Sequence, residues 1–217
     1  MKRLIPLGLL VLLMVAFIAG PACAADMKVK TPGMAMKKNS AVDLRMGMRK
    51  LWEDHITYTR NFIISSLADL EDAGKVAERL LKNQDDIGNA IKPIYGNEAG
   101  NKLASLLKDH ILIAVDIVKA AKSGDNDGVT NGQKRWHDNA DEIAAFLSGA
   151  NPNWSNKVLV DMLYKHLDYT TTEVVSRLQK DWAADIDAYD KGHEHMLMFA
   201  DTLTSGIVKQ FPKKFKK

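Results

Sequence analysis

Apolar residues recur every three or four positions over most of this chain, and this helical period limits the possible folds more than any other feature. Runs in which apolar and polar residues alternate, which are typical of strands, are nearly absent. Glycine and proline gather at a few points and divide the chain into long segments. We therefore predict an all-α fold, a helical bundle of about six helices without a sheet.

The breaks place these helices within one bundle domain, residues 39–212. The predicted helices span about 39–70, 75–91, 98–122, 129–147, 155–178 and 182–211. Short connections force neighbouring helices to run antiparallel. The sequence thus predicts three antiparallel hairpins of similar size.

A weak internal repeat supports the three hairpins. The odd-numbered helices each have a histidine near the middle, at His55, His110 and His166. The first two hairpins also share an Asn-x-Asp-acidic-Ile motif, whose asparagine follows the histidine by 28 residues at Asn83 and by 29 at Asn139. In the third hairpin, His193 follows His166 by 27 residues. We interpret these positions as a pseudo-repeat, with chance coincidence as the alternative.

Helical spacing places polar residues on the faces that should be buried. The stripes are Met48, Trp52, His55, Thr59 and Phe62; Leu103, Leu107, His110, Ala114 and Ile117; Leu159, Leu163, His166, Thr170 and Glu173; and Trp182, Ile186, Tyr189, His193 and Met196. A buried polar group without a partner costs about 1–3 kcal/mol. We therefore expect the four histidines to lie in one buried polar layer, where they contact one another, a water or an ion.

One hypothesis is a mononuclear metal site, because imidazole is the commonest protein ligand for zinc, copper and iron. The predicted ligands are His55, His110, His166 and His193, with Glu173 as a ligand or as an acceptor that orients an imidazole. The predicted polar residues around them are Asn83, Asn139, Asp190 and Thr170. The paired Glu-x-x-His segments of carboxylate-bridged di-iron bundles are absent from the sequence.

Two other function classes stay open. A metal-free hydrogen-bond network would make the protein a helical binding or structural module of the cell envelope. An enzyme is the third hypothesis and the least supported, since no nucleophile–base pair or phosphate-binding loop is visible in the sequence.

The first residues have the pattern of a secretory signal peptide. Lys2 and Arg3 precede an apolar run over 4–19, and Ala22-Cys23-Ala24 offers a cleavage site after residue 24. We predict a signal peptide (1–24), a lead segment (25–38), and export to the periplasm, the envelope or the medium. The alternatives are a retained N-terminal anchor and a lipoprotein modified at Cys23, although Gly20 makes a poor lipobox.

Charge gives little indication of a partner. The formal net charge is +3, and removal of Lys2 and Arg3 leaves +1, so nucleic acid is not an expected partner. The mature chain has no second apolar run long enough for a transmembrane domain. The basic tail, 213–217, offers a weak contact with an anionic membrane surface, with a solvated tail as the alternative.

Several segments together resemble an uncharacterised family of exported, all-helical microbial proteins. They are 51–65, 83–95, 109–117, 139–153, 170–175 and 181–190, with the ending 206–212. Members of such appearance are sometimes labelled glycosyltransferases. The sequence does not support that label, because strands do not alternate with helices and Asp185-Ile186-Asp187 lies within an amphipathic helix. The resemblance implies no catalytic residues.

Overall fold

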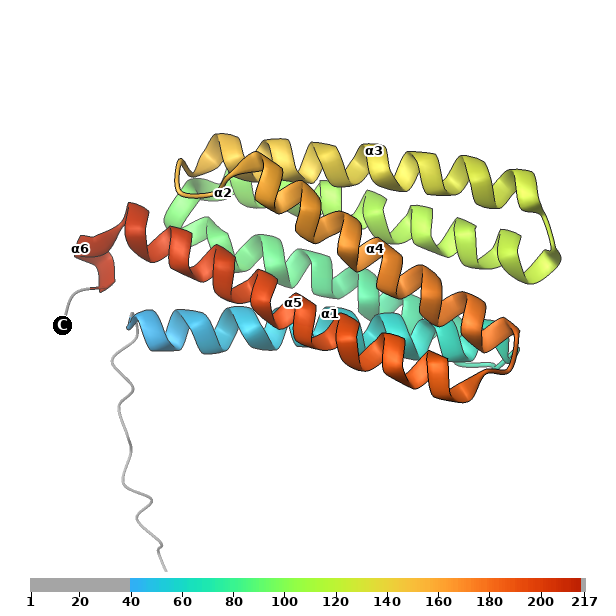
Figure 1. Ribbon diagram of the computed structural model, residues 1–217. Helices are drawn as coiled ribbons and strands as arrows, with labels where there is room; N and C mark the ends of the chain where they lie inside the picture. Colours follow the sequence, from blue (N-terminus) through green and yellow to red (C-terminus); the bar gives the residue numbers. More distant parts are fainter. Residues whose placement is uncertain (1–39, 216–217) are drawn as a thin grey trace, which may run out of the picture. The chain divides into compact units, whose positions relative to one another are not determined.

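The computed structural model describes residues 40–215. Six helices and no strand occur in this range (Figure 1). They are α1 (Ala41–Leu67), α2 (Ala73–Ser123), α3 (Asn126–Ala150), α4 (Asn156–Leu178), α5 (Trp182–Gln210) and α6 (Pro212–Phe215). The predicted all-α bundle is confirmed.

Several predictions lie outside the described residues. They concern the signal peptide (1–24), Cys23, the lead segment (25–38) and the last two residues of the basic tail. Residues 213–215 of that tail belong to α6, and the ammonium of Lys214 donates to the main-chain oxygen of Pro93 at 3.2 Å.

Capping side chains begin three of the long helices. Ser40 and Asp43 form a reciprocal capping box at the start of α1. Asp125 accepts a hydrogen bond from the amide of Gly128 at the start of α3, and Asp181 accepts one from Ala184 at the start of α5. These contacts satisfy amide groups that have no partner within the helix.

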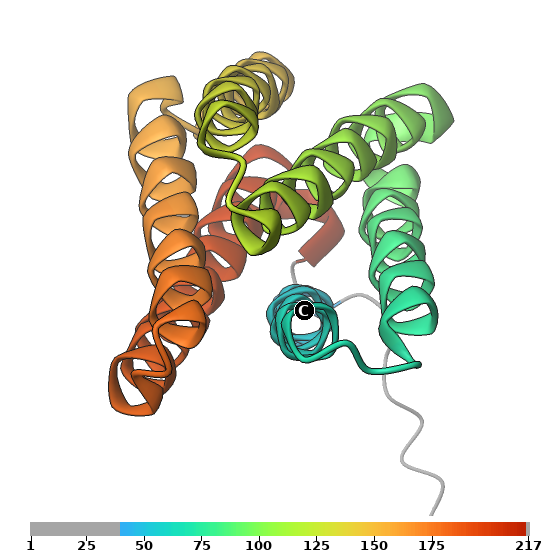
Figure 2. The ribbon, with the colours of Figure 1, turned by 90° about the vertical axis from the view of Figure 1, so that its right-hand side faces the viewer.

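The helix α2 is two arms that fold back on each other. Gly96 has φ 89° and ψ 167°, a conformation that only glycine adopts readily, and it separates a first arm (73–95) from a second arm (97–123). The chain reverses direction there (Figures 1 and 2). The arms touch closely, because a Cβ atom on Gly88 would lie 2.4 Å from the main-chain oxygen of Gly100. The two arms are thus the second and third predicted helices.

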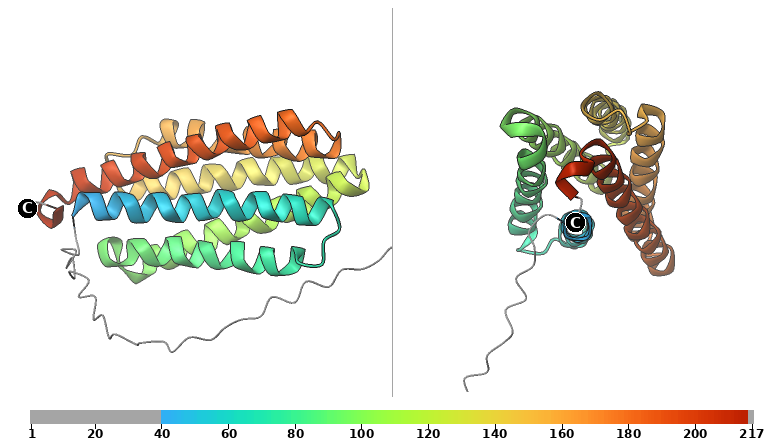
Figure 3. Two further views of the ribbon diagram at one scale, coloured as in Figure 1. Left: turned by 90° about the horizontal axis from the view of Figure 1, so that it is seen from below. Right: turned by 90° about the vertical axis from the view of Figure 1, so that its left-hand side faces the viewer.

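The chain consequently forms three hairpins: α1 with the first arm of α2, the second arm with α3, and α4 with α5. Further packing of α3 against α4, and of α1 against α5, closes the bundle. Seen end-on, α1 lies between the first arm of α2 and the α4–α5 pair (Figures 2 and 3). The predicted core stripes of α1, the second arm and α4 are largely buried.

The predicted stripe is wrong at the start of α5. Trp182 and Ile186 are 50% and 53% exposed, whereas Asp185 is 1% exposed. Asp185 is buried because it pairs with two arginines, and Gly192 lies on the same face against Tyr169. The buried face at the start of α5 therefore includes a charged residue and a glycine, and the large apolar residues Trp182 and Ile186 lie on another face.

Within residues 40–215, the helices are too short or too polar to cross a membrane.

Candidate site at three buried histidines

Three of the four predicted histidines meet in the core. His55 on α1, His110 on the second arm of α2 and His166 on α4 are only 2%, 3% and 2% exposed. The ring centroids of His55 and His166 are 5.5 Å apart, and those of His110 and His166 are 6.0 Å apart. We call these three residues the histidine cluster.

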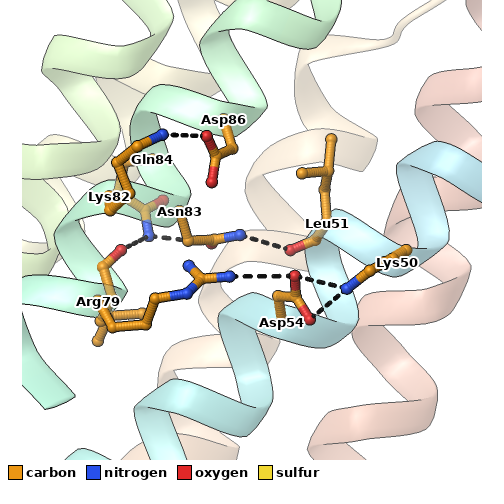
Figure 4. Close-up of polar contacts among 9 residues, drawn as sticks. Lys50, Leu51, Asp54, Arg79, Lys82, Asn83, Gln84 and Asp86 are labelled. Carbon is orange, nitrogen blue, oxygen red and sulfur yellow. Dashed lines mark hydrogen bonds and ion pairs between the residues drawn. The ribbon is translucent and has the colours of Figure 1, made fainter.

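Near the cluster, the same kind of hydrogen bond joins the two helices within each hairpin. The Asn83 amide donates to the main-chain oxygen of Leu51, four residues before His55, at 3.0 Å (Figure 4). The Asn139 amide donates in the same way to Leu106, four residues before His110, at 3.1 Å.

The third hairpin repeats this bond with a different residue. Nε2 of His195 donates to the main-chain oxygen of Met162, four residues before His166, at 2.7 Å. His195 follows His166 by 29 residues, the same separation as between His110 and Asn139. The equivalent residue in the third repeat is therefore His195, and the predicted equivalence of His193 is wrong.

Two of the clustered imidazoles have side-chain partners. Nδ1 of His110 lies 2.9 Å from Oδ1 of Asn139, and the amide nitrogen of Asn139 donates to the main-chain oxygen of Leu106. His110 therefore donates from Nδ1 and keeps a lone pair on Nε2. Nδ1 of His55 lies 3.4 Å from the amide nitrogen of Gln84 and can only accept there. The sequence reasoning missed Gln84, although it follows His55 by the same 29 residues.

His166 is left without a partner. Its Nδ1 atom is buried and has no hydrogen bond in the described part of the chain. Within residues 40–215, no hydrogen bond involves the Nε2 atom of any member of the cluster. Oε1 of Gln84 and Nε1 of Trp52 are also buried and unpaired in this range. An unpaired buried polar group costs about 1–3 kcal/mol, and a further hydrogen-bond or metal partner would offset that cost.

Burial keeps the cluster uncharged. It lowers the pKa of His55 to about 3, with a contribution from the neighbouring His110. It lowers the pKa of His110 to about 4, against the opposing effect of the Asn139 hydrogen bond. The pKa of His166 lies well below its usual value, because of burial and then of the adjacent histidines. All three are neutral imidazoles at pH 7, the form that binds metals.

A cavity of about 60 Å³ adjoins the cluster, and all three histidines line it. Its other walls are largely apolar, with Ile63, Leu80 and Val118 among them. None of the described residues that line it is Asp, Glu, Lys or Arg. The cluster therefore faces an uncharged space.

His193 and Asp190 do not belong to the polar core, which corrects the prediction. The His193 side chain is 27% exposed, and its Nε2 lies 3.5 Å from a carboxylate oxygen of Glu53. Glu53 is exposed and lies two residues before His55, so it projects from a different face of α1. Asp190 is exposed on α5. The shift of the buried face of α5 accounts for both differences.

The other predicted polar residues are buried. Asn83 and Asn139 make the bonds given above, and the hydroxyl of Thr170 donates to the main-chain oxygen of His166 at 3.0 Å. Glu173 is buried too, but its carboxylate accepts from Arg60 at 2.7 Å. Glu173 thus pairs with an arginine two turns along α4 from His166.

A buried ion cluster surrounds Glu173, and the sequence reasoning missed it. Arg60 also pairs with Asp185 at 2.7 Å, and Arg177 pairs with Asp185 at 2.8 Å. Burial raises the pKa of Glu173 to about 7 despite Arg60. Burial alone would also raise the pKa of Asp185, but hydrogen bonds and charge from both arginines hold it below its usual value. The ion cluster joins α1, α4 and α5.

In the described residues, no group of three or more His, Cys, Asp or Glu side chains is placed so that it could hold a metal ion. The three imidazoles are near one another without forming such a group in this conformation.

Comparisons with protein-family models, with curated proteins and with solved structures found no match to this chain.

Proposed function

We propose that this protein binds a single transition metal ion, such as zinc, copper or iron, through His55, His110 and His166. The observation that supports this most is the meeting of three buried, neutral imidazoles from three helices. A Zn–N bond of ~2.0–2.1 Å, with roughly 1.2 Å from nitrogen to ring centre, puts the centroids of tetrahedral imidazole ligands about 5 Å apart. The centroid distances of 5.5 and 6.0 Å lie close to that separation.

Binding requires the rings to turn. The χ2 torsion of histidine has broad wells, so the torsion itself opposes such a rotation only weakly. His110 already uses Nδ1 on Asn139, which orients the ring and leaves Nε2 to bind a metal. His166 has Nδ1 unpaired in the described chain. A fourth coordination position would be left for water or a small ligand.

We also propose that the protein is exported, on the pattern of the first 24 residues. Intact-mass measurement of protein from its native cells tests this. A mass that lacks residues 1–24 supports it, whereas a mass that retains them, or a lipid on Cys23, contradicts removal of the whole segment.

Metal titration of histidine variants tests the metal proposal. Metal-stripped protein is titrated with zinc against a chromophoric chelator, and the bound metal is counted by elemental analysis. We expect one ion per chain. Loss of a partner that only orients a ligand weakens metal affinity by about 10–100-fold, so His110→Ala should weaken it by more than about 100-fold.

His193→Ala is the matched control, because His193 lies outside the cluster, and its affinity should equal that of the wild type. A wild-type chain that binds no ion contradicts the proposal, as does a His193→Ala variant that alone loses the ion.

A metal-free role is the second candidate. It is favoured by the contacts that His55 and His110 already make with Gln84 and Asn139, which suit a structural network. In that case His110→Ala lowers stability, and the wild type binds no metal in the same titration.

A further inference from the structure

We propose that the cavity beside the histidine cluster is a binding site for a small, uncharged molecule with one hydrogen-bonding group. The molecule would place its apolar part against the cavity wall and its polar atom against the imidazoles. This site does not depend on a bound metal, because the same cavity and the same unpaired nitrogen exist without one.

The unpaired imidazole of His166 indicates a ligand. It is 2% exposed, lines the cavity, and has no hydrogen-bond partner for Nδ1 in the described chain. Thr59 and Thr170 line the same space, but their hydroxyls are engaged by main-chain oxygens of their own helices. A hydroxyl group, which both donates and accepts, would suit the free positions of the imidazoles.

The walls of the cavity define the chemistry and size of the ligand. Since the described lining contains no charged side chain, an ion would lose its hydration without compensation. The volume of about 60 Å³ exceeds the ~10–15 Å³ needed for one water but is well below the roughly 150 Å³ of an engineered cavity that holds benzene. Molecules of a few heavy atoms therefore fit.

The wall of the cavity reaches the protein surface at α3 and α4. Val175 on α4 lines the cavity and is 43% exposed, and Val129 near the start of α3 lines it as well. Gln133 on α3 donates to the hydroxyl of Thr171 on α4 at 3.0 Å, and both residues line the cavity. The two helices separate towards this end of the bundle (Figure 1). A ligand would enter most readily here, where two valines and one hydrogen bond lie at the surface end of the cavity wall.

The test uses metal-stripped protein and two probes. Xenon, followed by the ¹²⁹Xe chemical shift, reports on the apolar part of the cavity. Ethanol, followed by the ¹⁵N shifts of the imidazoles, reports on the polar end. Ala114→Leu fills the cavity from the second arm of α2, and Ala145→Leu adds the same side chain at an exposed position on α3.

We expect saturable xenon shifts, and an ethanol-dependent shift of His166, in the wild type and in Ala145→Leu. Ala114→Leu should lose both. Val118→Ile adds only one methylene at the wall and should weaken both responses. It replaces Ala114→Leu in the test if that variant does not fold. Absence of a saturable response in the wild type would overturn the proposal, as would equal responses in the filled variants. Because no metal is present, neither result depends on the metal-binding function.

Discussion

At the scale of single residues, burial of the histidine cluster determines how the protein responds to acid. An unfolded histidine has a pKa of about 6.5, whereas burial lowers the folded values to about 3 for His55 and about 4 for His110. Between these limits the unfolded chain binds more protons than the folded one. The contribution of the neutral histidines to the free energy of unfolding is therefore fully present above pH 6.5, and it falls as the pH is lowered towards 4.

We predict a loss of roughly 1 kcal/mol per clustered histidine for each pH unit below about 6. Urea unfolding at several pH values measures it. His110→Gln should give a shallower dependence, whereas His193→Ala should keep the wild-type slope. A stability that is flat between pH 7 and 5 would show that the cluster is not buried in neutral form.

Glu173 gives stability the opposite dependence on pH. Burial raises the pKa of its carboxyl group from 4.5 to about 7, so its contribution to stability falls as the pH rises through this range. Glu173→Gln removes the buried charge and keeps an oxygen that can accept from Arg60. We expect the free energy of unfolding of the variant, relative to that of the wild type, to rise by about 1–3 kcal/mol from pH 5 to pH 8. Urea unfolding measures this difference.

Glu142→Gln, on the exposed side of α3, is the control for this prediction, and its stability relative to the wild type should not change with pH. If Glu173→Gln loses stability most at pH 8, the carboxylate is needed in charged form by Arg60 and Arg177.

At the scale of elements, the contact between the arms of α2 depends on two glycines. A Cβ atom at position 88 would lie 2.4 Å from the oxygen of Gly100 and 2.8 Å from the Cβ of Ala104. Main-chain atoms cannot move aside without shifting a helix. We predict that Gly88→Ala lowers the free energy of unfolding by about 1–3 kcal/mol.

Gly47→Ala is the matched control, because no atom lies within 4 Å of a Cβ added to this residue of α1. It should raise stability by up to about 1 kcal/mol, since alanine is the better helix former. Thermal unfolding compares the two. Equal effects of both substitutions would contradict close packing of the arms.

The sequence predicts most elements for a simple reason: their apolar stripes and breaks are local. The break at Gly96 and the stripes through His55, His110 and His166 follow from the helical period and from glycine and proline. The start of α5 does not, because the face that is buried there is selected by the pairing of Asp185 with Arg60 and Arg177. Such pairing links residues that are distant in the sequence, and the periodicity of apolar residues cannot predict it.

At the scale of the whole molecule, three hairpins bring one histidine each to a common centre. In each hairpin, a side chain of the second helix donates a hydrogen bond to the first helix. The acceptor is the main-chain oxygen four residues before the clustered histidine. The motif shared by the first two hairpins predicts two of these positions, Asn83 and Asn139. A histidine at a similar separation, His193, is the predicted third position, whereas the hydrogen bond belongs to His195.

We predict that Asn139→Ala weakens the centre as a whole, because Asn139 bonds both Leu106 and His110. Stability should fall by about 1–3 kcal/mol, since a buried imidazole loses its partner. Zinc affinity should fall by about 10–100-fold, since the ring loses the group that orients it. Asn131→Ala, at an exposed position on α3, should leave both properties unchanged.

The meeting of His55, His110 and His166 at one metal is tested most directly by anomalous diffraction at the zinc absorption edge from crystals of the zinc-loaded protein. A single peak should lie about 2.0–2.1 Å from one nitrogen of each of these histidines. A peak beside His193 and Glu53, or no peak within bonding distance of the three imidazoles, would contradict the metal site.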